Sequence, residues 1–318
     1  MKYTKPALTF PDQADLLLKR GLVAPSRQAI IEKLQAVSYY RLSAYWFPFR
    51  QPDDTLKPGT TLEMVWRRYT FDRQLRCLVL DAIERVEISV RTQLVCQHSL
   101  KHGPFGYLDR AKLPGLNVTD HRDLLNRIHD EAGRSREDFV RHFFSKYTSE
   151  TDLPLWMACE LMTFGAMFTL FRGVETSAKQ TIAAEYGVAD RVLESWLATF
   201  NQVRNLCAHH ARLWNRAFGV RPQIPRPNKH PDWHHPVAIT NDRLFGVMTV
   251  LHYLLLRVAP QSQWRQRWEN LLARYADIPI AAMGFPANWK DSPLWQTTAL
   301  PPALPTTPSA SPASGGTP

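Results

Sequence analysis

The sequence is short of cysteine and of acidic residues, and each shortage excludes a class of protein. Four cysteines stand among 318 residues and no two form a C-x-x-C pair, which argues against a structural zinc site or a redox pair. We expect all four to be small buried hydrophobic residues: Cys77, Cys96, Cys159 and Cys207. Asp and Glu number 29 against 39 Lys and Arg, so the formal charge is +10. Such a basic balance favours nucleic acid or an anionic membrane as partner.

Long hydrophobic runs are also missing. The longest apolar stretch lies near residues 244–258, is interrupted by His252, and falls short of the roughly 20 residues that span a bilayer. The N-terminal residues lack the apolar segment of a secretory signal peptide. We therefore expect a cytoplasmic protein with no membrane association.

The hydrophobic pattern that is present has a helical period. Val79, Ile83, Val86 and Val90 step by three or four residues, as the buried face of a helix does. We expect this longest helix to begin at a capping box of Thr60 and Glu63 and to run to about His98. No segment alternates strongly enough for a sheet, so the predicted fold class is all-α.

Composition divides the chain into three predicted parts. Residues 1–59 read as an N-terminal helical extension and residues 60–295 as an α-helical core. Residues 296–318 consist largely of Pro, Ser, Thr, Ala and Gly, cannot bury a core, and are predicted to be disordered.

Residues 204–216 form the densest polar run, with the sequence R-N-L-C-A-H-H-A-R-L-W-N-R. We expect one helix to begin near residue 189 and to continue through this run. Residues three and four apart share a helix face, so four polar residues should form one stripe: Asn205, His209, Arg212 and Arg216. Arg204 would lie about 100° around the helix from Asn205, with a side chain long enough to reach the stripe.

This combination of residue types suits RNA cleavage without a metal. Histidine transfers protons near neutral pH, and arginine holds phosphate with a permanent charge. RNA carries its own nucleophile, the 2′-OH, so cleavage needs only a base, an acid and charge stabilisation. The spacing alone is weak evidence, because Arg and His recur at similar distances at Arg122 with His129 and at Arg136 with His142.

The same run resembles the signature of the AbiD/AbiF-type abortive-infection proteins, which belong to the HEPN superfamily of helical ribonucleases. Further blocks match in the family's order over roughly residues 10–295: S-Y-Y-R-L-S-A-Y-W from residue 38, F-D-R-Q-L-R from 71, I-E-R-V-E-I-S-V-R from 83, P-L-W-M from 154 and G-F-P from 284. Several blocks in order are far more specific than one spacing.

The resemblance implies a HEPN-like bundle, a homodimer that brings two motifs together, and metal-independent RNA cleavage in anti-phage defence. It assigns catalysis to Arg204, His209 and the following polar residue Asn205, and RNA binding to His210, Arg212 and Arg216. Cofactors are not implied. Some relatives associate with a small partner RNA, and toxic activity implies a restraint such as an antitoxin, which no motif here identifies.

Other features leave alternatives open. Glu87 and Arg91 are four apart and could assist RNA binding, or form only a surface ion pair. The aromatic residues from 39 to 49 could stack on bases, although core packing is the better interpretation, and the basic loop 221–229 could grip phosphates or simply be exposed. The histidines near 209 and 230–235 could bind a metal, but no carboxylate completes a known spacing. The alternative function is a non-catalytic RNA-binding or regulatory protein.

Overall fold

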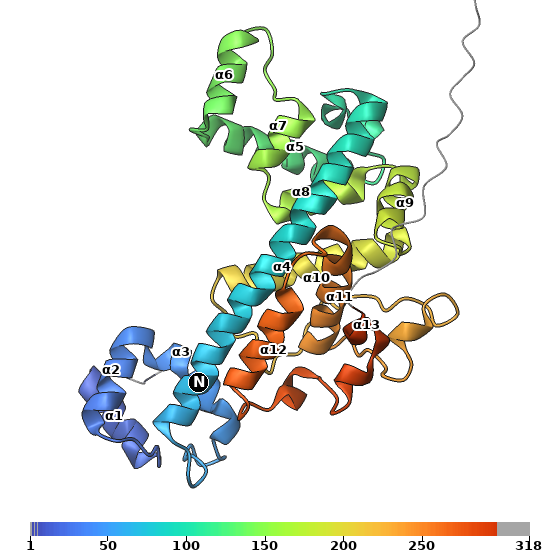
Figure 1. Cartoon of the computed structure of the whole chain (residues 1–318). Coiled ribbons are helices and arrows are strands. Elements are labelled where there is room, and N and C mark those ends of the chain that lie inside the picture. Colours follow the sequence, from blue (N-terminus) through green and yellow to red (C-terminus); the bar gives the residue numbers. More distant parts are fainter. Residues whose placement is uncertain (1, 3, 5, 298–318) are drawn as a thin grey trace, which may run out of the picture.

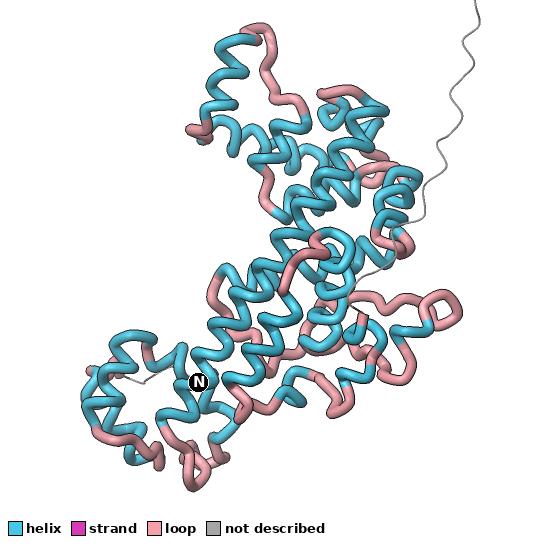
Figure 2. Tube along the Cα trace, viewed as in Figure 1, coloured by secondary structure: helices cyan, strands magenta, loops and turns pink. Residues whose placement is uncertain are grey.

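The structure, a computed structural model, describes residues 2, 4 and 6–297. Within that part of the chain the protein is all-α, as predicted, and extended pairing is limited to two isolated bridges (Figure 2). The predicted disordered tail lies outside the described residues except for 296 and 297. Among the described helices, none combines the length and the apolar character that crossing a bilayer requires.

One long helix, α4, forms the axis of the molecule, and the other helices are arranged along it (Figure 1). It extends from Leu62 to His102, four residues beyond its predicted end. Its N-cap is Thr61, whose side chain accepts a hydrogen bond from the Met64 N–H, so the predicted cap at Thr60 is wrong by one residue. Thr60 instead donates its hydroxyl to the Lys57 carbonyl.

The N-terminal helices pack at one end of α4 and form a small core of their own with its first turns. They are α1 (Phe10–Lys19), α2 (Arg27–Val37) and α3 (Tyr39–Trp46). Ser26 caps α2, accepting a hydrogen bond from the Ala29 N–H. This small core is made of aliphatic residues together with Tyr45 and Trp46.

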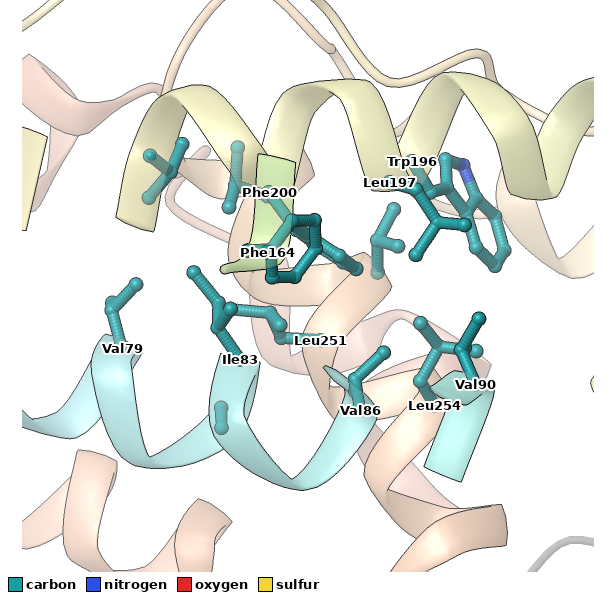
Figure 3. Close-up of a cluster of buried hydrophobic side chains, with 14 of the residues drawn as sticks. Val79, Ile83, Val86, Val90, Phe164, Trp196, Leu197, Phe200, Leu251 and Leu254 are labelled. Atoms are coloured by element: carbon teal, nitrogen blue, oxygen red, sulfur yellow. The ribbon is translucent and has the colours of Figure 1, made fainter. Parts of the chain in front are cut away.

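A much larger core surrounds the middle of α4. Figure 3 shows Val79, Ile83, Val86 and Val90 of α4 facing large side chains from α8, α10 and α11, so the predicted buried face of the long helix is confirmed. The helices packed around the middle of α4 in this core include α8 (Phe164–Gly173), α9 (Thr176–Glu185), α10 (Asp190–Ala208), α11 (Leu244–Val258), α12 (Trp264–Arg274) and α13 (Pro293–Gln296).

The far end of α4 carries three further helices: α5 (Val118–Arg134), α6 (Asp138–Lys146) and α7 (Leu155–Leu161). Of these, α5 and α6 are strongly amphipathic, with the apolar face buried. Residues 218–236 form a long connection before α11, and Trp233 within it is buried against Trp196 and Tyr253.

Two predictions about small and aromatic residues need correction. Cys77 and Cys96 are exposed and only Cys159 and Cys207 are buried, because α4 turns the first two cysteines away from the core. In the aromatic run, Tyr40 is 88% exposed and Phe47 is 61% exposed. Tyr40 lies in the first turn of α3 and Phe47 directly follows its last residue, and both side chains are exposed, while Tyr45 and Trp46 fill the small core.

Candidate functional site: the turn that ends α10

The polar run begins in the last turn of α10 and leaves the helix at Ala208. His209 is the C-cap residue, and its N–H still donates to the Asn205 carbonyl at 2.9 Å. The His210 N–H then donates to the Cys207 carbonyl and the Ala211 N–H to the Leu206 carbonyl, which is the hydrogen-bond pattern of a Schellman motif. After this turn the chain continues without a helix as far as residue 231.

The predicted continuous stripe is therefore wrong in its second half. Asn205 and His209 remain one turn apart, but Arg212 and Arg216 lie beyond the helix end. The Arg212 Nη1 donates to the Ala44 carbonyl of α3 at 2.8 Å, and the Arg216 Nε donates to the Arg212 carbonyl at 2.8 Å. These two arginines support the turn and do not extend a helix face.

The turn requires a left-handed residue, and His210 supplies it with a φ of 57°. Glycine usually occupies this position because it has no Cβ to clash, whereas for other residues the left-handed conformation costs about 1–2 kcal/mol of conformational free energy. The Arg41 guanidinium of α3 donates to the His210 carbonyl at 2.6 Å and helps to hold it in place.

A buried carboxylate fixes the chain just after the turn. Asp72 of α4 accepts hydrogen bonds from the backbone N–H groups of Leu213 at 3.1 Å and of Trp214 at 2.6 Å. Its second oxygen accepts from the Tyr45 hydroxyl at 2.7 Å and from the Arg76 guanidinium at 2.5 Å. Four donors therefore satisfy one fully buried carboxylate, and the network connects α3, α4 and the turn.

A second polar group, the pair Glu87 and Arg91 of α4, lies near the motif. Arg91 donates to Glu87 at 2.6 Å and to the Met162 carbonyl at 3.1 Å, and the pair is largely buried, so the alternative of a plain surface ion pair is wrong. Burial raises the pKa of the Glu87 carboxyl, and the positive charges of Arg91 and Arg204 act in the opposite direction. Arg204 therefore lies within the electrostatic reach of this pair.

The three residues predicted to be catalytic share one property. Arg204 is half-buried, Asn205 and His209 are exposed, and none of their side chains has a hydrogen-bond or ion-pair partner within residues 6–297. Directly beneath them, burial raises the pKa of the Cys207 thiol to about 12, which keeps this cysteine an uncharged packing residue. The motif thus offers free polar groups on a firmly held backbone.

A cavity of about 510 Å³ opens beside the turn, between the end of α2, the start of α3, α4 and the end of α10. Three arginines and His210 contribute to its lining, which comprises Ala36, Val37, Arg41, Tyr69, Arg73, Arg76, Cys77, Leu80, Cys207, Ala208 and His210. It is called the arginine pocket below. No carboxylate is among these residues.

Sequence reasoning missed the residues that shape this site. Tyr45 and Arg41 lie in the block S-Y-Y-R-L-S-A-Y-W, and Asp72 and Arg76 in the block F-D-R-Q-L-R, yet neither block received a role. The available signal was an Asp and an Arg four apart at otherwise apolar helix positions, which points to a buried pair. Which distant backbone that pair would hold could not be read from spacing.

The described residues contain no group of three or more His, Cys, Asp or Glu side chains arranged to hold a metal ion. Of the histidines considered as ligands, His234 faces the Pro225 carbonyl, with its Nε2 at 2.8 Å from that oxygen.

Comparison with known proteins adds one finding. A family model described as Abi-like protein matches residues 32–215, which is more than half of the chain and covers α3, the whole of α4 and the turn after α10. No curated protein and no solved structure matches the chain significantly.

Proposed function

Because the chain belongs to the Abi-like protein family, we propose that it is a metal-independent endoribonuclease of an abortive-infection defence system. The observation that carries this proposal is the state of the motif. Arg204, Asn205 and His209 have unengaged side chains, while the backbone that bears them is held by Asp72 and Arg41. Groups that act on a substrate need this combination of free side chains and fixed positions.

In the proposed reaction the 2′-oxygen of the RNA attacks the adjacent phosphorus and the bond from phosphorus to the 5′-oxygen breaks. His209 of one copy takes the 2′-OH proton, and a second histidine returns a proton to the leaving 5′-oxygen. Arg204 binds the scissile phosphate, Asn205 orients it, and Arg91 with Glu87 assists RNA binding beside Arg204. The products carry a 2′,3′-cyclic phosphate and a 5′-OH.

One histidine cannot act as base and acid in the same step. We therefore propose a homodimer in which the partner supplies the second His209. The end of α10 is suited to this because Asn205 and His209 are exposed and face away from the protein's own core.

The test uses the purified full-length protein and a long single-stranded RNA, with and without a chelator. His209→Ala should reduce cleavage by about 10²–10⁴-fold, the usual contribution of general acid–base catalysis. His142→Ala is the matched control, since His142 is an exposed histidine of α6 far from the motif. End-group analysis should find cyclic phosphate and 5′-OH.

Three results would count against the proposal: equal cleavage by His209→Ala, a 3′-OH product, or cleavage that the chelator abolishes. Tight RNA binding without cleavage by the wild type would favour the alternative, a non-catalytic RNA-binding or regulatory protein that associates with a small RNA.

A further inference from the structure

The proposed catalytic residues do not line the arginine pocket. The residues that do line it are suited to a negatively charged ligand. Its volume of about 510 Å³ lies within the range of small-molecule sites, about 300–1,000 Å³. It is bounded by helices from both cores, so its walls are set by rigid elements and not by a loop alone.

The charges around the pocket do not cancel. Arg76 is paired with the buried Asp72 and is therefore neutralised. Arg73 is exposed and has no ion-pair or hydrogen-bond partner within residues 6–297. Arg41 uses one nitrogen on the His210 carbonyl and keeps its other donors free. Two guanidinium groups are thus available in a pocket lined by no acidic residue, which suits an anion that accepts several hydrogen bonds.

The left-handed conformation of His210 is a second, independent observation that points to a ligand in the arginine pocket. Glycine at position 210 would relieve the strain of φ 57°, yet the chain places a histidine there and that histidine lines the pocket. Backbone strain of this kind persists where the side chain has a task that outweighs the cost.

We infer that the arginine pocket binds a backbone phosphate of single-stranded RNA, in the nucleotide next to the one that is cleaved. This inference rests on the proposed function for its choice of RNA. His210 directly follows His209, so a strand whose phosphate contacts Arg204 and His209 can place a neighbouring phosphate at Arg41, Arg73 and His210. The pocket then determines which phosphodiester bond of the strand is placed at Arg204 and His209.

The test measures binding and cleavage separately. A 5′-fluorescein-labelled oligouridylate of about twelve nucleotides is titrated with full-length protein carrying His209→Ala, and binding is followed by fluorescence anisotropy. The His209→Ala substitution prevents cleavage during the measurement. Adding Arg73→Ala should weaken binding about tenfold, the value of one charge-assisted contact. It should also lower the slope of log affinity against log salt by about 0.7, the value for one phosphate contact on a single strand.

Arg122→Ala is the matched control, because Arg122 is an exposed arginine of α5 and the substitution removes the same charge far from the pocket. It should leave affinity and salt slope unchanged. Arg73→Lys should fall between wild type and Arg73→Ala, since lysine keeps the charge but loses the bidentate geometry.

His210→Gly separates the ligand role from a structural one. It should leave the melting temperature unchanged or raised, because the strain disappears, and should still weaken oligouridylate binding several-fold. A lowered melting temperature, or unchanged binding, would overturn the role given to His210.

Inorganic phosphate and uridine monophosphate serve as competitors. Displacement of the oligouridylate by either one at equal phosphate concentration would overturn the assignment to RNA and favour a free phosphate or nucleotide. Arg73-dependent binding, together with no RNA cleavage by the protein that retains His209, would reject the proposed nuclease and leave the pocket standing. Normal cleavage and normal binding by Arg73→Ala would reject the pocket alone.

Discussion

The large core and the small core of this protein are each held together by apolar contacts, but the junction between them is polar. Around the middle of α4, side chains from α8, α10 and α11 interlock without charge (Figure 3). Between α3, α4 and the turn after α10, the contacts are those of Arg41, Asp72, Arg76 and Arg212.

A polar junction of this kind is better suited than an apolar core to position the groups of a functional site. Apolar packing stabilises the helices but fixes no individual polar atom, whereas a buried charge network has only one arrangement in which every group is satisfied. The candidate site lies at the polar junction, where the positions of backbone atoms are determined most strictly.

Asp72→Ala should have the largest effect on the polar junction. It removes four hydrogen bonds and leaves Arg76 as an uncompensated buried charge, which should cost about 3–5 kcal/mol of unfolding free energy. The proposed RNA cleavage should be lost as well, because the turn that carries His209 is released.

Urea denaturation and the cleavage assay measure the two effects. The double variant Asp72→Leu with Arg76→Met tests whether the loss of stability comes from the uncompensated charge of Arg76. It should regain part of the stability but not the cleavage, because apolar residues can replace a buried ion pair but cannot accept the hydrogen bonds that hold the turn. Full stability in the single variant would show that the junction is not a determinant of the fold.

A matched pair of leucines compares the two cores directly. Leu34 and Leu254 are both fully buried, the first in the small core and the second in the large one, and replacement of either by Ala should cost about 2–5 kcal/mol. Leu34→Ala should lower hydrogen-exchange protection mainly in α1–α3, whereas Leu254→Ala should lower it throughout α4, α10 and α11. We expect this difference because the small core has far fewer buried residues than the large core. Identical exchange patterns would mean that both cores open as one unit.

The effect that is smallest at neutral pH is a pH dependence that belongs to the large core. His252 is stacked between Trp264 and Trp295, and burial lowers its pKa from 6.5 to about 4. The unfolded chain therefore binds a proton that the folded chain does not, so stability is complete above pH 6.5 and falls by about 1.4 kcal/mol per pH unit as the pH drops toward 4.

His98, buried in α4, has its pKa lowered to about 4 by burial and adds to the same loss. Urea midpoints between pH 4 and 7 measure the dependence, and His252→Phe should remove about half of it. A variant with the full wild-type slope would contradict the assignment to His252.

Much of the helical architecture follows from local sequence. The face of α4, the start of α10 at Asp190 and the two polar helices α5 and α6 were predictable because their apolar residues repeat with the helical period and capping residues precede several of them. The predicted boundary between residues 59 and 60 and the roles of the site residues remain predictions.

The end of α10 was not predictable in the same way. No glycine or proline marks it, and the residues A-H-H-A-R-L-W-N are compatible with a continuing helix. The helix ends because Arg41, 169 residues away in the chain, binds the carbonyl of a left-handed histidine, and because Asp72, 142 residues from Trp214, takes up the backbone N–H groups that follow.

By itself, the sequence determined the helical fold class, the basic charge and the identity of the polar groups in the motif, since these depend only on composition and on local periodicity. The tertiary structure decided which of those groups are free to act and where the arginine pocket opens. Both depend on hydrogen bonds between residues far apart in the chain, and such bonds leave no periodic trace in the sequence.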